Sequence, residues 1–213
     1  MKILYRIVNA LLAATIFPVA LLLEFVIFRL STSFVDAGLE ESITLKQLIG
    51  FFTGSDRIIG FKYENIKSGG PLEFPAALNP VKAQLIAVVV AFALAIIAAI
   101  FIIVWSCCSN KRIPVVIGSL VGIISVIVMI ACFNSAAAPL IEGTINPVNI
   151  FSSGLLASLL GNVVFVDMLQ FGGFQNGMII VFVAILLWTA AYYIVEIGEP
   201  KEEKTPKKSK NKK

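Results

Sequence analysis

The feature that most constrains this chain is a set of four apolar runs, each about as long as a bilayer-spanning helix. They cover residues 7–28, 85–106, 114–133 and 178–197. A helix needs about 20 apolar residues to cross the hydrocarbon core of a bilayer. With a mean hydropathy of +0.93, the runs predict an all-α integral membrane protein with a four-helix transmembrane domain in residues 1–198.

The first run lies near the start of the chain, where a secretory signal peptide also has an apolar stretch. This run is longer than a typical signal, and no small-x-small cleavage site follows it at the usual distance. We therefore expect it to remain in the protein as a span. Pro18 lies within it and predicts a kink, because proline removes one backbone hydrogen bond.

The distribution of charge predicts the orientation of the spans. Basic residues precede the first run, fill the short turn between the second and third runs, and follow the fourth. These positions are Lys2, Arg6, Lys111, Arg112 and seven lysines after Gly198. Between the third and fourth runs the charges are Glu142 and Asp167, both acidic. The positive-inside rule then predicts that both termini and the short turn are cytoplasmic.

Two outer loops, residues 31–79 and 134–177, predict a small extracytoplasmic cap. Thr44 can cap a short helix whose apolar residues follow helical spacing up to Gly54, and residues 59–64 alternate like a short strand. Asn79-Pro80 is a common start signal for the second span. Residues 150–161 predict a helix too short to span, either interfacial or re-entrant, and 163–166 a strand or a helix continuation.

Small residues at four-residue spacing predict where helices pack. In lipid, such residues let two backbones approach closely, because burying apolar surface contributes little there. The predicted packing residues are Ala83, Ala87, Ala91, Ala95, Ala99, Gly118, Gly122, Ser125, Ser153, Ala157 and Gly161.

The side-chain chemistry favours a non-enzymatic role. The chain has no histidine, so it lacks the usual general base and the commonest metal ligand. We therefore expect no catalytic residues, metal or cofactor, and an accessory subunit, assembly factor or scaffold that acts through helix packing and the cap. The alternative is a small transporter or channel with a pathway near Asn9, Glu24, Arg29 and the segment 150–161. A surface-sensing cap is a third class.

The remaining expectations concern partners and location. Residues 199–213 predict a disordered lysine-rich tail that contacts anionic lipid headgroups. The lysines concerned are Lys207, Lys208, Lys210, Lys212 and Lys213. A second copy or another membrane subunit is the expected protein partner, with no nucleic acid. The absence of a cysteine framework and of glycosylation sequons mildly favours a bacterial cytoplasmic membrane.

The order of spans and loops is similar to the layout of claudin-like tetraspan proteins. Both arrangements have cytoplasmic termini, a long first outer loop, a short inner turn and a second outer loop. The tryptophan and paired-cysteine pattern of a claudin first loop is missing here. The resemblance therefore extends to topology alone.

Overall fold

Four helical stretches long and apolar enough to cross a membrane occur in the part of the chain that the structure describes. That structure is a computed structural model, which describes residues 2–32, 35–53, 55, 76–109, 111–146 and 164–198. The stretches are the broken helix α1 (Lys2–Ala14) and α2 (Ile16–Leu22), α4 (Lys82–Cys108), α5 (Ile113–Ile141) and α8 (Phe174–Gly198). The molecule is therefore mostly helical, as the hydropathy predicted.

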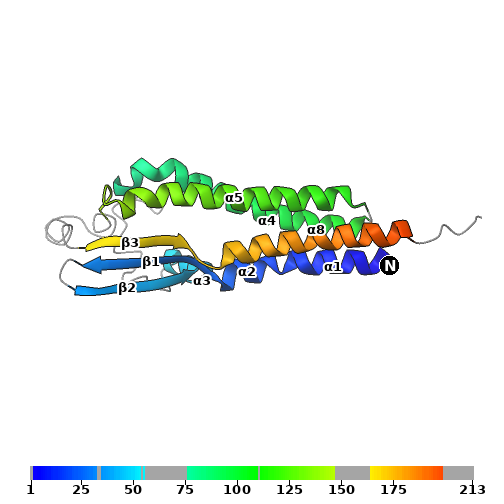
Figure 1. The fold of residues 1–213 in the computed structure, drawn as a ribbon, viewed down its shortest axis with the longest axis horizontal. Helices are drawn as coiled ribbons and strands as arrows, with labels where there is room; N and C mark the ends of the chain where they lie inside the picture. The colour runs from blue at the N-terminus through cyan, green and yellow to red at the C-terminus, as the bar shows by residue number, and fades with distance from the viewer. Residues whose placement is uncertain are drawn as a thin grey trace, which may run out of the picture.

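The helices form a bundle in which each span has two neighbours. Helix α1 contacts α4 and α8, and α5 contacts the same two helices, so the order around the bundle is α1, α4, α5, α8. The chain turns from α4 to α5 at the end where α1 begins and α8 finishes (Figure 1). We call this the turn end, and the opposite end the sheet end.

The break in the first span has a local cause. Pro18 has no N–H to donate to the carbonyl of Ala14, and α1 stops at that residue. Thr15 lies between the two helices, and its hydroxyl donates a hydrogen bond to the carbonyl of Leu12 at 2.7 Å. The kink predicted from Pro18 therefore falls about one turn before the proline.

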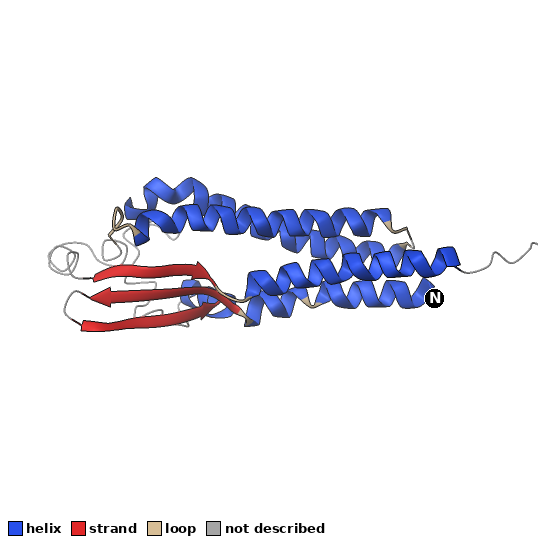
Figure 2. Cartoon of the chain, in the orientation of Figure 1, coloured by secondary structure: helices blue, strands red, loops and turns tan. Residues whose placement is uncertain are grey.

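Strands gather at the sheet end (Figure 2). Among the described residues, β1 (Glu24–Thr32), β2 (Val35–Thr44) and β3 (Val164–Phe171) form one antiparallel sheet in the order β2-β1-β3. In the register, Val26 lies opposite both Ile43 of β2 and Phe171 of β3. Strand β1 follows directly from α2, and β3 leads into α8. The sheet is therefore connected in the chain to the first and the last span.

Two predictions about this region are wrong. The fold is not all-α, and the first span ends at Leu22 rather than Phe28, because Glu24–Phe28 belong to β1. Aromatic and β-branched side chains in Glu24–Thr32 favour an extended strand when partner strands pair on both sides. For residues 163–166 the sequence predicted either a strand or a helix continuation. In the structure, strand β3 begins at Val164.

The short helix of the first outer loop is confirmed as α3 (Leu45–Thr53), which contacts α2 and β2. The hydroxyl of Thr44 accepts the N–H of Gln47 at 3.2 Å, and the side-chain oxygen of Gln47 accepts the N–H of Thr44 at 2.8 Å. This reciprocal pair is a capping box. The predicted strand at 59–64 and helix at 150–161 lie outside the described residues.

Helices α4 and α5 are longer than a bilayer requires. Their 27 and 29 residues span about 40 Å, against a hydrocarbon core of about 30 Å. The outer part of α5 contacts β3 and lies beside the sheet in Figure 1. Asn79 does not cap α4 as predicted, because Asn79 and Pro80 lie inside the 3₁₀ helix η2 (Ala76–Val81) that precedes it.

Candidate functional sites

The sheet is attached to the bundle by five phenylalanine side chains, which we call the phenylalanine cluster. They come from β1, α4, α5, β3 and α8, and they are Phe25, Phe92, Phe133, Phe171 and Phe174. Their ring centroids lie 3.9 to 6.2 Å apart in stacked or edge-on pairs; all but the Phe133–Phe171 pair fall within the separations that aromatic pairs prefer. Sequence reasoning missed this cluster because its members come from five separate segments.

Glycine at 172 supports the same junction. A side-chain carbon at Gly172 would overlap the backbone of Glu24, so only glycine lets the chain pass there. The N–H of Gly172 donates a hydrogen bond to the carbonyl of Phe25 at 3.0 Å. This bond continues the pairing of β1 with β3, so the two strands stay joined up to the point where the chain enters α8.

At the turn end, Arg6 of α1 closes the last turn of α4. Its Nε donates a hydrogen bond to the carbonyl of Ser106 at 2.7 Å, and its terminal nitrogen donates to the carbonyl of Cys107. The last carbonyls of a helix have no partner within the helix. An arginine from a neighbouring helix therefore satisfies two of them and ties α1 to α4.

A second arginine links the start of α5 to the end of α8. Arg112 forms an ion pair with Glu196, and its guanidinium lies 5.1 and 5.0 Å from the ring centroids of Tyr192 and Tyr193. The ring of Tyr192 also stacks on that of Tyr5, at 4.5 Å between centroids. Charged and aromatic side chains therefore join α1, α5 and α8 at this end.

Several polar side chains are buried near the turn end without a hydrogen-bond partner among the described residues. They are the hydroxyls of Tyr5, Ser106 and Thr189, the amide of Asn9, and the indole N–H groups of Trp105 and Trp188. Burying a polar group without a partner costs free energy. Only Asn9 was predicted as a site residue. For Ser106 and Thr189 the available signal was a small hydroxyl residue inside an apolar run, and for the others it was an aromatic residue with a polar group near the end of a span.

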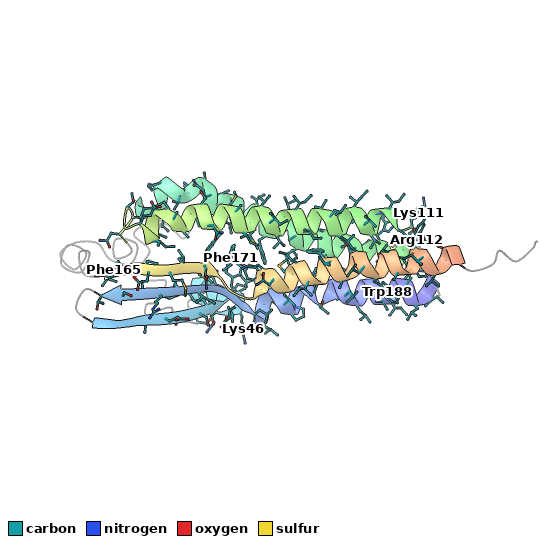
Figure 3. All side chains as sticks on the ribbon, viewed as in Figure 1. Lys46, Lys111, Arg112, Phe165, Phe171 and Trp188 are labelled. Atoms are coloured by element: carbon teal, nitrogen blue, oxygen red, sulfur yellow. The ribbon has the colours of Figure 1, made fainter. Side chains whose placement is uncertain are left out.

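A groove of about 1100 Å³ opens between the start of α5 and the last turns of α8. Its walls are mainly apolar, and its lining includes Lys111, Arg112, Trp105 and Thr189. Figure 3 places Lys111, Arg112 and Trp188 at the turn end, far from Phe165 on the sheet. No sequence motif indicated this groove, because its residues come from three spans and a turn.

The predicted packing residues fall into three groups. Ala91, Ala95, Ala99, Gly118, Gly122 and Ser125 are buried, Ala87 is half-buried and Ala83 is exposed. Ser153, Ala157 and Gly161 lie outside the described residues.

The two glycines of α5 face different helices. A side-chain carbon at Gly118 would lie 2.8 Å from Cγ1 of Ile102 on α4, whereas one at Gly122 would overlap the ring of Phe182 on α8. Both glycines were predicted as packing residues, and both are buried. Gly118 leaves space for the side chain of Ile102 on α4, and Gly122 leaves space for the ring of Phe182 on α8.

The predicted pathway residues are not brought together. Asn9 is completely buried within α1, whereas Glu24 and Arg29 are exposed on β1 at the sheet end. The tail lysines Lys207, Lys208, Lys210, Lys212 and Lys213 lie outside the described residues.

Carboxylates and cysteines do not gather into a site in the part of the chain that is described. No group of three or more histidine, cysteine, aspartate or glutamate side chains there could hold a metal ion. Asp167 accepts a hydrogen bond from the hydroxyl of Ser31, and Glu142 is exposed at the end of α5.

Comparisons of the chain with protein-family models, with curated proteins and with solved structures give no match. The features that bear on function are therefore those of the molecule itself. They are a sheet packed against the helix bundle through the phenylalanine cluster and a groove with basic residues at the opposite end.

Proposed function

We propose that this chain is a non-enzymatic multi-pass membrane protein that acts as an accessory subunit, assembly factor or scaffold. The observation that carries the proposal is the packing of the sheet against the bundle through the phenylalanine cluster. A sheet held in one position relative to the spans can present a fixed surface to a partner. Such rigidity suits recognition of another protein outside the bilayer.

The sheet supplies a suitable recognition element in β2. This strand is an edge of the described sheet, and an edge strand offers backbone N–H and C=O groups to an added strand. Leu39 is 54% exposed on it, beside the exposed Glu40. A partner strand with apolar and basic side chains would complement this edge.

The outer part of α4 supplies a second surface. Ala83 is exposed and Ala87 is half-buried, so the predicted small-residue face continues beyond the part covered by α5 and α1. Small residues left uncovered at four-residue spacing favour a helix from a partner or a second copy.

We further propose that the turn end faces the cytoplasm, in a bacterial cytoplasmic membrane. Arg6, Lys111 and Arg112 outnumber Glu196 at the turn end, whereas acidic residues outnumber the basic Arg29, Lys46 and Lys82 at the sheet end. This excess of positive charge at the turn end supports the orientation expected from the positive-inside rule.

The proposal is tested by the native mass of the protein after gentle solubilisation from its own membrane. We expect a complex heavier than the 23.0 kDa chain, and we expect Ala83→Leu with Leu39→Arg to release the partner. Ala93→Leu, at an exposed position of α4 off the alanine face, is the matched control. A wild-type protein that migrates only as a monomer would refute the subunit role.

A second candidate, a small transporter or channel, is favoured by one observation. The amide of Asn9 is completely buried and has no hydrogen-bond partner among the described residues, as expected of a group that binds water or solute inside a bundle. Proteoliposome flux of small solutes would test this role. Flux that Asn9→Leu abolishes would support transport, and flux unchanged by it would exclude a pathway at Asn9.

A further inference from the structure

The groove at the turn end has the shape and lining of a site for a lipid chain. Its volume of about 1100 Å³ is at the upper end of the range for ligand pockets. Ile113 and Ile117 of α5 form one wall, and Leu186 and Ala190 of α8 line the other. Ile113 is 73% exposed and Ile117 is 53% exposed, so this apolar surface lies open at the side of the bundle.

The basic residues at the opening of the groove indicate that the lipid has an anionic headgroup. Arg112 is already paired with Glu196, so its charge is largely balanced. Lys111 is exposed at the same opening and is not balanced by an ion pair among the described residues. The positive end of the α5 dipole lies at this point, and the dipole and the lysine both favour an anion.

Two buried polar groups supply an independent indication of a ligand. Thr189 lines the groove, is 3% exposed, and its hydroxyl has no hydrogen-bond partner among the described residues. The indole N–H of Trp105, which also lines the groove, is equally without a partner in the described part. Both groups can donate a hydrogen bond and belong to residues that line the groove, so acceptor oxygens of a bound ligand would give them partners.

We propose that this groove binds one anionic glycerophospholipid. Its phosphate would lie at Lys111, its ester oxygens would accept hydrogen bonds from Thr189 and Trp105, and an acyl chain would lie along Ile113, Ile117 and Leu186. The mainly apolar wall selects a lipid over a free anion, because phosphate alone would leave that wall uncovered. This site is independent of the proposed partner-binding role of the sheet.

The test uses the purified full chain in detergent, with phosphatidylglycerol or phosphatidylcholine of identical acyl chains added at equal concentration. Native mass spectrometry then measures which lipid stays bound. We expect one phosphatidylglycerol per chain to be retained in preference to phosphatidylcholine. Lys111→Gln should lower the preference about fivefold, which is the effect of one basic residue at a membrane surface.

Substitutions in the wall of the groove distinguish binding of the acyl chain from attraction of the charged headgroup. Ala190→Phe should remove both lipids, because its ring occupies the groove from an exposed position. Thr189→Val, which keeps the shape but removes the hydroxyl, should weaken retention of both lipids without changing their ratio. The controls are Lys46→Gln on α3 and Ile180→Phe on an exposed part of α8, which should behave like the wild type.

Three results would overturn the proposal. Equal retention of the two lipids by the wild type would show that the charge of the headgroup does not determine binding. Undiminished phosphatidylglycerol binding by Ala190→Phe and Thr189→Val would place the lipid elsewhere. Displacement of phosphatidylglycerol by millimolar inorganic phosphate would show an anion site without a chain site.

Discussion

The ring of Phe25 on β1 stacks on the ring of Phe174 on α8, with centroids 4.5 Å apart and an interplanar angle of 29°. Phe25 is the second residue of its strand, and Phe174 is the first residue of its helix. The contact therefore joins the point where the chain leaves the first span to the point where it enters the last. It orients the sheet relative to the membrane bundle.

The phenylalanine cluster should be a major source of stability. Phe171 is buried and stacks on Phe133, so Phe171→Ala should cost about 3–5 kcal/mol in the free energy of unfolding. Phe165→Ala is the control, because Phe165 lies on the same strand but is 42% exposed; it should cost about 0.5 kcal/mol or less. Thermal unfolding in detergent measures both, and equal losses would contradict the packing argument.

Gly122 should tolerate no larger side chain while Phe182 is present. Gly122→Ala would overlap that ring and should destabilise the bundle by about 1–3 kcal/mol. Adding Phe182→Leu should recover part of the loss, because the smaller side chain makes room; a double-mutant cycle measures this coupling. At Gly173, an added carbon meets nothing within 4 Å, so Gly173→Ala should be nearly neutral.

Arg6 should stabilise the turn end through its two backbone contacts. Arg6→Met keeps the length of the side chain but removes its donors to Ser106 and Cys107. Hydrogen bonds from charged groups contribute about 1.5–3 kcal/mol, and a loss of that size is expected in detergent unfolding. The matched change Arg29→Met, at an exposed position of β1, should have little effect, and a similar loss there would refute this role.

The capping box of α3 should determine whether that helix forms. Thr44→Ala removes the oxygen that accepts the N–H of Gln47 and should cost about 1 kcal/mol. Because α3 is short, the effect should appear as faster amide hydrogen exchange in Leu45–Thr53. Ser42→Ala, two residues earlier on β2, should leave that exchange unchanged.

The orientation of the bundle can be tested with the native cysteines. Cys107 and Cys108 are exposed at the turn end, and Cys132 is half-buried in α5. If the turn end is cytoplasmic, a membrane-impermeant maleimide should label Cys107 and Cys108 in inside-out vesicles but not in intact cells. Labelling in intact cells would reverse the proposed orientation.

Part of this architecture could be predicted from local sequence. A span depends on the summed hydropathy of neighbouring residues, and a capping box on residues three apart, so four apolar helices and α3 could be read directly. The buried part of the alanine face of α4 also follows from four-residue spacing, since Ala91, Ala95 and Ala99 point to one side of a helix.

Contacts between distant segments could not be read in that way. Glu24–Phe28 continue an apolar run, and only their pairing with β2 on one side and β3 on the other makes them a strand rather than a helix. Strand β3 lies more than 100 residues later in the chain. Gly118 and Gly122 have the same local pattern, yet one packs against α4 and the other against α8. The groove beside Lys111 likewise exists only because the start of α5 lies against the end of α8.

The sequence by itself determined that the chain has four helical stretches long and apolar enough to cross a membrane, because hydropathy is a sum over adjacent residues. Tertiary structure alone decided where the first span stops, how the sheet is attached and where a groove remains. These depend on which distant side chains fill the space beside each other, as Phe25 and Phe174 do.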